Sequence, residues 1–440
     1  MNQKKKISKK IIIIVIILII IIGLLVFLLP NFLNNKTSTE SSSNSSKITS
    51  GGKYEITGDN ECIVINTKEE VELDLTDATI SCSNGPAINV KAAENVKIVL
   101  TGDNKIEAKT TESLDGAIYS KDDLELEGDG TLTITSNYDG IVSKDDLKIN
   151  SGTYTITADD DGIRGKDSVE ISESTITIKA GGDGVKATNE EEEEKGYVIV
   201  KGGKLDIESQ NDGIAAITTL ALEEADITIK TTSTNEEDSR KGLKSDTNIE
   251  ITGGKYNITS TDDAIHSNGN ITLNSGEFTI ESDDDALHAD GLIEIKDGTY
   301  SIKAHEGIEG TYVKIGGGTI TIDASDDGIN AANKSDQYTP TVEINGGEIT
   351  INMGQGDTDG IDSNGNLYLN GGTIKINAQS PFDYDGEAKL NGATLIINGT
   401  ETTTITNQMM GGMGGQAPGQ QGQQPTDRAQ GGYGGPGGRR

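Results

Sequence analysis

The feature that most constrains the fold is a short motif, Asp followed by Gly or Ala and an apolar residue, which recurs through the middle of the chain. Asp139, Asp161 and Asp183 each begin a copy, and consecutive copies lie 22 residues apart. Asp263 and Asp285 begin two later copies with the same spacing. Self-similar units of this length are typical of a solenoid, in which each repeat contacts its neighbours.

Each repeat contains only short segments in which apolar and polar residues alternate. One copy reads "LKINSGTYTITADDDGIRG", from Leu147 to Gly165. Alternation with a period of two predicts strands, and every segment is too short for a helix. The sequence therefore predicts an all-β domain, a right-handed parallel β-helix with about 22 residues per coil, in which successive coils pair about 4.8 Å apart.

Two columns of apolar residues are predicted to face the inside of this β-helix. The first contains Ile163, Val185, Leu243, Ile265, Leu287, Ile308, Ile329 and Ile361. The second contains Leu132, Tyr154, Ile176, Leu205, Tyr256, Phe278, Tyr300 and Ile320. Because the aromatic residues occupy inward positions, we expect them to pack in the core rather than to form a sugar-binding platform.

Composition divides the chain into five segments. They are a basic cytosolic segment (1–10), a transmembrane anchor (11–29), a flexible linker (30–50), the β-helix (51–407) and a disordered Gly- and Gln-rich tail (408–440). Residues 11–29 are apolar and uncharged, and this stretch is about as long as a membrane span requires. The lysines before it favour a cytosolic N-terminus. We therefore expect a single-pass membrane protein with an extracellular β-helix. The alternative is a cleaved signal and a secreted protein.

Charge and cysteine content narrow the class of protein further. The net charge of −34 argues against a nucleic-acid partner. The chain has two cysteines, Cys62 and Cys82, which lie about one coil apart. They are either stacked thiols or a disulfide that closes the N-terminal end.

Stacking the coils places acidic residues above one another, for example Asp161 above Asp183. Two such charges about 4.8 Å apart repel by about 3.5 kcal/mol at an effective dielectric constant near 20. Calcium would remove this repulsion, because it accepts many oxygen ligands in loose geometry. The alternative is a solvated acidic edge without a metal. The predicted calcium ligands are Asp160, Asp161, Asp183, Asp263, Asp284, Asp285, Asp327 and Asp359.

The residue after "DGI" or its equivalent is predicted to face outward and to line a ligand site. The predicted ligand-binding residues are Arg164, Lys186, Lys244, His266, His288, Glu309 and Asn330. Insertions follow this strand at 188–196 and 332–339 and precede it at 231–239 and 352–358. Loops on both sides of one strand face predict the walls of a groove for a linear polymer.

The units "DDGI", "DDALHAD" and "NGGxIxI", together with the Lys-rich anchor and the Gly/Met/Gln-rich tail, resemble a known family. It comprises the calcium-containing, carbohydrate-binding parallel β-helix proteins of clostridial surfaces, which are related in fold to pectate and pectin lyases. The resemblance covers roughly residues 50–407. It implies binding of plant or surface polysaccharide, with Asp161, Asp183, Asp263 and Asp285 as calcium ligands.

Three functions remain open from the sequence. The favoured one is calcium-dependent binding of a uronate-containing or cellulose-like polysaccharide without catalysis, and calcium bridges favour uronates. The second is a uronate lyase with calcium and Arg164 or Lys186 as base. The third is a structural surface spacer or adhesin. His266 and His288, one coil apart, are additionally candidate transition-metal ligands, although an exposed pair more often has no such role.

Overall fold

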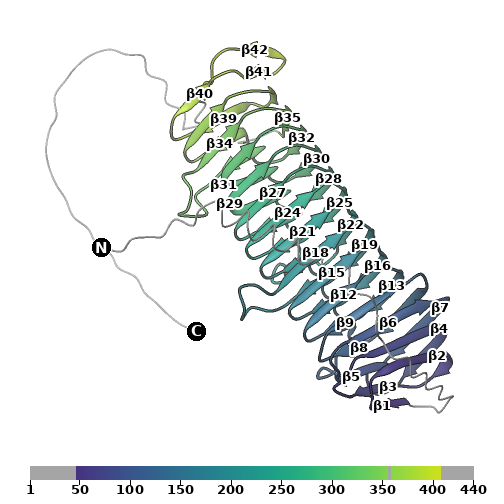
Figure 1. The fold of residues 1–440 in the computed structure, drawn as a ribbon. Helices are drawn as coiled ribbons and strands as arrows, with labels where there is room; N and C mark the ends of the chain where they lie inside the picture. Colours follow the sequence, from purple (N-terminus) through teal and green to yellow (C-terminus); the bar gives the residue numbers. More distant parts are fainter. Residues whose placement is uncertain (1–45, 355–357, 408–440) are drawn as a thin grey trace, which may run out of the picture.

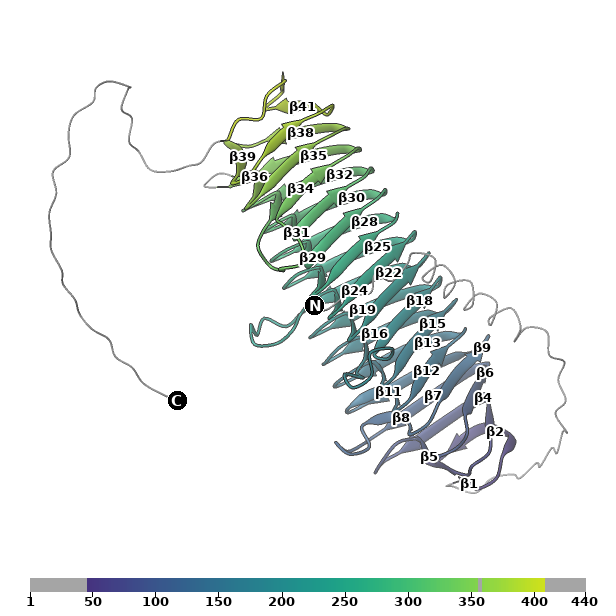
Figure 2. The same cartoon turned by 60° about the vertical axis from the view of Figure 1, so that its left-hand side comes forward.

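The computed structural model describes residues 46–354 and 358–407. Within these residues the chain forms one elongated parallel β-solenoid with no α-helix, as Figures 1 and 2 show. None of its described elements is a helix long and apolar enough to cross a membrane. The predicted segments 1–10, 11–29 and 408–440 lie outside the described residues.

Each coil contributes strands to three faces, which we call A, B and C, and pairs with the coils before and after it. Face A consists of β7 (Asp103–Ala108), β10 (Thr131–Ser136), β13 (Thr153–Ala158), β16 (Thr175–Ala180), β19 (Lys204–Ser209), β22 (Asp226–Thr231), β25 (Lys255–Ser260), β28 (Glu277–Ser282), β30 (Thr299–Ala304), β32 (Thr319–Ala324), β35 (Glu348–Met353), β38 (Thr373–Asn377) and β41 (Thr394–Ile397). Face B consists of β1 (Ser46–Ile48), β3 (Ile63–Asn66), β5 (Ile88–Ala92), β8 (Gly116–Ser120), β11 (Asp139–Ser143), β14 (Ile163–Gly165), β17 (Val185–Ala187), β20 (Ile214–Ala216), β23 (Leu243–Ser245), β26 (Ile265–Ser267), β33 (Ile329–Ala331), β36 (Asp359–Ser363), β39 (Ser380–Tyr384) and the first parts of β29 (Leu287–Ile295) and β31 (Ile308–Ile315).

Face C consists of β6 (Val96–Thr101), β9 (Leu124–Gly128), β12 (Asp146–Ile149), β15 (Ser168–Ser172), β18 (Tyr197–Lys201), β21 (Thr219–Glu223), β24 (Asn248–Thr252), β27 (Asn270–Leu273), β34 (Thr341–Ile344), β37 (Asn366–Leu369), β40 (Ala388–Leu390) and the second parts of β29 and β31. At the N-terminal end, β2 (Gly52–Asn60) and β4 (Val71–Cys82) run from face C into face A. At the other end, β42 (Thr400–Thr402) pairs antiparallel with β41.

The register confirms the predicted repeat. Tyr154 lies opposite Ile176 on face A, and Ile163 lies opposite Val185 on face B, so one coil corresponds to 22 residues here. Every member of the two predicted inward columns is buried. In the second column the ring of Phe278 stacks on the neighbouring tyrosine rings with centroids 4.8 and 4.7 Å away, which confirms that these aromatics belong to the core.

The small residue that follows the Asp of the repeated motif is explained by the close approach of adjacent coils. A Cβ atom on Gly162 would lie 2.5 Å from the carbonyl oxygen of Gly184 and 2.5 Å from a methyl carbon of Ile178. Contacts this short force neighbouring atoms to move. Buried Ala264 and Ala286 take the equivalent place in two later coils, so only a small residue is found at these positions.

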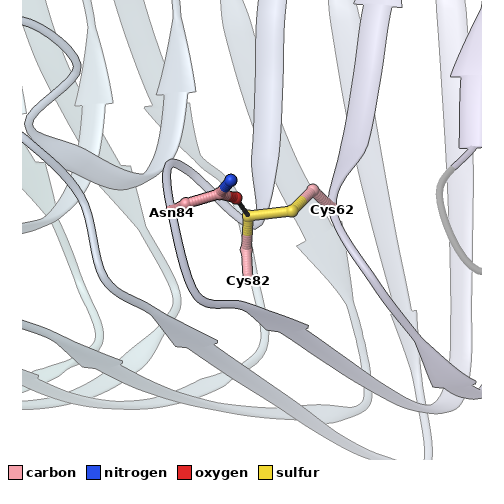
Figure 3. The surroundings of a disulfide bond; sticks show 3 residues. All are labelled: Cys62, Cys82 and Asn84. Carbon is pink, nitrogen blue, oxygen red and sulfur yellow. Dashed lines mark hydrogen bonds between the residues drawn. A yellow bond between two sulfur atoms is a disulfide. The ribbon is translucent and has the colours of Figure 1, made fainter.

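The N-terminal end is closed by a short strand and a disulfide. β1 lies within the stretch predicted to be linker and pairs with β3, so Ser46–Ile48 belong to the solenoid. Cys62, just before β3, and Cys82, at the end of β4, form a disulfide with Cα atoms 5.0 Å apart (Figure 3). The choice between stacked thiols and a disulfide is thereby resolved. In addition, Asn84 Oδ1 lies 3.9 Å from the Cys82 sulfur.

Candidate functional site

Each coil turns from face A to face B at an acidic corner, where the Asp of the repeated motif lies. Oδ1 of Asp139 accepts the backbone N–H of Asp161 at 3.1 Å, and Oδ1 of Asp161 accepts the N–H of Asp183 at 2.9 Å. Asp139 and Asp161 are only 1% and 4% exposed. Because hydrogen bonds to a charged acceptor are stronger than neutral ones, these carboxylates join each coil to the next.

The same bond recurs along the solenoid, and we call these residues the carboxylate column. Its members are Asp139, Asp161, Asp183, Asp212, Asp263, Asp285, Asp327 and Asp359. In one coil Lys241 replaces the aspartate. Its N–H still donates to Asp212 Oδ1 at 2.8 Å, and its Nζ lies 2.9 Å from Asp262 and 3.2 Å from Asp263.

Five of the predicted ligand-binding residues form a column of their own on face B. We call Arg164, Lys186, Lys244, His266 and His288 the basic ladder. They are the second residues of β14, β17, β23, β26 and β29. Arg164 pairs in register with Lys186, Lys244 with His266, and His266 with His288. The structure therefore brings these residues together as the repeat predicts.

Arg164 faces outward from the solenoid but is not free in solvent. Its Nε lies 2.8 Å from Oδ2 of Asp139, and its guanidinium also forms a salt bridge with Asp115. The Arg164 side chain is 17% exposed. Burial raises the pKa of Asp139 to about 6, although Arg164 opposes this shift. Arg164 therefore covers the carboxylate column instead of extending freely into solvent.

The two lysines of the ladder make the same kind of contact. Lys186 Nζ lies 2.7 Å from Asp161 Oδ2 and 3.0 Å from Asp183 Oδ2, and Lys244 Nζ lies 3.5 Å from Asp212 Oδ2. Burial lowers the pKa of Lys186, but the charges of Asp183 and Asp161 outweigh it and raise the pKa above its usual value. One lysine thus neutralises charge on two coils.

The two histidines complete the ladder. Nδ1 of His266 lies 2.7 Å from Asp263 Oδ2, and Nδ1 of His288 lies 2.6 Å from Asp285 Oδ2 and 3.2 Å from Glu309 Oε2. Burial lowers the pKa of His288, but its hydrogen bond to Asp285 outweighs this and raises the pKa. Burial disfavours the charged form of Asp263, yet the bond from His266 and nearby cations hold its pKa below the usual value.

Beyond His288 the ladder position carries no cation within the described residues. It is occupied in register by Glu309, Asn330, Asp362 and Asp383. Glu309 is paired with Lys334 Nζ at 3.0 Å. We call Asp327, Asp359, Asp362 and Asp383 the acidic end. Asp362 and Asp383 occupy the ladder position beyond Asn330, and Asp327 and Asp359 lie at the adjoining corners.

Two carboxylates of the acidic end, Asp327 and Asp362, have raised pKa values. Burial raises the pKa of Asp327 to about 7, and the charges of Asp362 and Glu306 add to this shift. Burial likewise raises the pKa of Asp362 to about 6, with the charges of Asp383 and Asp359 next in importance. These carboxylates therefore lie where ionisation is unfavourable and where a cation would be favourable.

Calcium binding stays a prediction, but the contacts divide the eight predicted ligands into three groups. Four already contact the basic ladder, namely Asp161, Asp183, Asp263 and Asp285. Two are exposed at the corner, namely Asp160 and Asp284. Two belong to the acidic end, namely Asp327 and Asp359. The repulsion that predicted a metal is thus relieved by side-chain cations over much of the column.

The sequence interpretation missed several members of this network. Asp139 and Asp212 begin copies of the same motif as the predicted ligands, so the repeat indicates that they belong to the carboxylate column. Asp362 occupies the ladder position of its coil, which the repeat also indicates. Asp383 lacks the motif, and only its register with Asp362 identifies it.

A polar hollow lies beside the acidic corners where the inserted loop 231–241 departs from face A. Its volume is about 610 Å³, and it is lined by Thr234, Glu236, Arg240, Thr261, Asp262, Asp283, Asp284 and His305. Figure 2 shows loops projecting on the side of the solenoid where β11, β29, β31 and β36 lie. Side-chain contacts fix parts of these loops, for example Ser239 with Asp212 at 2.7 Å. The insertions predicted at 188–196, 231–239 and 332–339 therefore form loops, whereas residues 355–357 of the fourth insertion lie outside the described residues. The groove between the loops stays a prediction.

Comparison with known proteins identifies the family. A model of the family "Carbohydrate-binding domain-containing protein" matches residues 42–286 and 283–412, which is most of the chain. The chain belongs to this family. A curated protein of Acetivibrio thermocellus with the same description is 35% identical over 118 residues, which are 23% of this chain and 41% of that protein. The chain thus matches less than half the length of this relative.

A solved structure is also similar in part. It is described as the polysaccharide lyase-like protein from C. thermocellum, in a gadolinium derivative. It is 31% identical, covers 51% of this chain and 91% of its own chain, and has a TM-score of 0.43.

The contact between Arg164 and Asp139 should contribute to stability. Replacing Arg164 with Met keeps much of the stem but leaves the carboxylate of Asp139 buried without its main counter-charge, which should cost about 3 kcal/mol. Thermal unfolding should show a melting temperature lower by several degrees. Lys179→Met is the control, because Lys179 forms an exposed pair with Glu208 that should contribute less than about 1 kcal/mol. Equal losses for both variants would contradict the role of the basic ladder.

The raised pKa of Asp362 predicts a pH-dependent effect of Asp362→Asn in chelator. The protonated carboxyl stabilises the fold below its usual pKa of 3.8, and this contribution is lost as the pH rises through about 6. Asn is neutral at every pH, so the variant should match the parent near pH 4 and melt a few degrees higher near pH 8. Asp206→Asn, on the exposed side of face A, is the control. A difference independent of pH would contradict this assignment.

Proposed function

We propose that this protein is a non-catalytic, calcium-dependent polysaccharide-binding protein of the cell surface, attached to the membrane through residues 11–29. Face B is the proposed binding surface. The family supports binding of carbohydrate, and the lysines before residue 11 support the orientation of the anchor. A linear polysaccharide is the substrate class that suits a straight, repetitive face.

The observation that carries this proposal is the basic ladder held in place by buried carboxylates. Each member of the ladder is fixed by at least one ion pair or hydrogen bond, so its polar atoms are preorganised. Coils are spaced about 4.8 Å apart, which is close to the length of one sugar unit in an extended chain. The sugars of a polymer that follows the solenoid axis can therefore meet the ladder residues in turn, with Ala215 between Lys186 and Lys244.

Calcium fits the acidic end better than the rest of the column. Asp327, Asp359, Asp362 and Asp383 supply carboxylates from adjacent coils, and calcium takes oxygen ligands in flexible geometry. When bound, calcium would supply positive charge and open positions for the carboxylates of a uronate. The chain carries a net charge of −34, so a polyanion is repelled at long range without such a cation.

The lyase alternative is disfavoured because its candidate bases, Lys186 and Arg164, are held in their charged forms. A general base must be uncharged when it accepts a proton, and enzymes lower the pKa of a catalytic lysine toward neutrality. Lys186 instead contacts two carboxylates, and its pKa is raised. Arg164 is likewise held by Asp139 and Asp115. These contacts favour binding over proton abstraction.

Native electrophoresis in gels that contain polygalacturonate or a soluble β-glucan tests the proposal. Both polymers should retard the parent protein, and chelator should abolish retardation by polygalacturonate, because the calcium bridge is lost. Lys186→Gln combined with Lys244→Gln should weaken binding at least tenfold for either polymer, because these side chains line face B. Asp362→Asn should weaken binding to polygalacturonate only.

The matched control is Lys179→Gln combined with Lys201→Gln, which removes two exposed lysines from faces A and C. Thermal unfolding of each variant separates loss of binding from loss of folding. Retardation that is equal in the control and in the face B variant would place the site elsewhere. Absence of retardation by both polymers would leave the spacer function.

A further inference from the structure

His266 and His288 differ from the other members of the basic ladder because their imidazole rings can offer a nitrogen lone pair to a ligand. The chain has three histidines, and these two stack on adjacent coils with ring centroids 4.8 Å apart and planes inclined by 32°. Each ring is bound on its inner side by a buried carboxylate. Nδ1 of His266 lies 2.7 Å from Asp263, and Nδ1 of His288 lies 2.6 Å from Asp285.

This arrangement determines which nitrogen of each ring is available for a ligand. When Nδ1 donates its hydrogen to a carboxylate, Nε2 carries the lone pair and the ring is held in one orientation. A carboxylate behind Nδ1 is the usual outer partner of a metal-binding histidine, because it fixes the tautomer and makes Nε2 more basic. Both rings of the pair have such a partner.

The outward nitrogens lie beside two oxygen donors. Nε2 of His266 is 2.9 Å from Oδ1 of Asn268, which accepts its hydrogen, so a metal ion would replace this hydrogen bond; Nε2 of His288 is 3.9 Å from Oδ1 of Asp290. The Asp290 side chain is 42% exposed, so it is accessible from solvent. Nitrogen and oxygen donors thus gather on the outer surface of β26 and β29.

We propose that His266, His288 and Asp290 bind one divalent transition-metal ion of the Cu²⁺, Ni²⁺ and Zn²⁺ class. Metal–nitrogen bonds of about 2.0–2.1 Å require the two ligating nitrogens to lie no more than about 4.2 Å apart, so the rings, with centroids 4.8 Å apart, must turn toward one another when the ion binds. Imidazole favours these metals, whereas calcium takes oxygen ligands. The site is therefore chemically distinct from the acidic end and does not depend on the proposed function.

Titration of the full chain, purified without a histidine tag, with CuCl₂ at mildly alkaline pH tests the proposal. Calorimetry should show one tight site, and electron paramagnetic resonance of the bound Cu²⁺ should show coupling to two nitrogens. His266→Asn should weaken Cu²⁺ binding at least tenfold, and excess Ca²⁺ should not compete, since the donors include nitrogen. NiCl₂ and ZnCl₂ should bind at the same site more weakly than CuCl₂.

Two further variants make the result decisive. Asp290→Asn should weaken Cu²⁺ binding severalfold without changing the metal-free melting temperature, because Asp290 does not belong to the carboxylate column. His305→Asn is the matched control, since His305 is exposed and lies near Glu306 and Asp326 instead. A spectrum of the parent without nitrogen coupling, or loss of binding in His305→Asn alone, would overturn the proposal.

Discussion

The structure depends on one interaction, the hydrogen bond that the backbone N–H of one coil donates to a buried aspartate of the coil before it. It holds consecutive acidic corners together, but it also buries a negative charge in each coil that carries the aspartate, as at Asp139 and Asp161. A buried charge without a partner is costly, so each carboxylate requires a counter-charge close by. The basic ladder meets this requirement from the outer side of face B. Stability and a charged surface therefore arise from the same residues.

The residue that supplies the counter-charge differs along the solenoid, and the ligands that each segment of face B can bind differ accordingly. Arg164 and Lys186 are fixed cations, His266 and His288 are imidazoles, and the acidic end beyond Asn330 has no ladder cation among the described residues. One repeated scaffold thus presents a permanently charged segment, a nitrogen-donor segment and an oxygen-donor segment. The insertions between strands add loops beside these segments without breaking the register of the coils.

The sequence predicted the architecture well because the repeat is encoded locally. Alternation and the period of 22 residues identified the inward columns, including the stack around Phe278, and the outward ladder. The sequence did not predict that Arg164 and Lys186 neutralise the aspartates, because alternation distinguishes inward from outward but does not show which outward side chains bend back onto the corner. The predicted membrane segment, residues 11–29, lies outside the described residues.

The central claim is that face B is the binding surface. Hydrogen exchange, measured by mass spectrometry with and without a bound oligosaccharide in the presence of calcium, tests it most directly. The account predicts slower exchange in peptides that contain β14, β17, β23 and β26, with little change on the exposed side of face A. Slower exchange confined to face A or face C, with face B unaffected by a ligand that demonstrably binds, would contradict it.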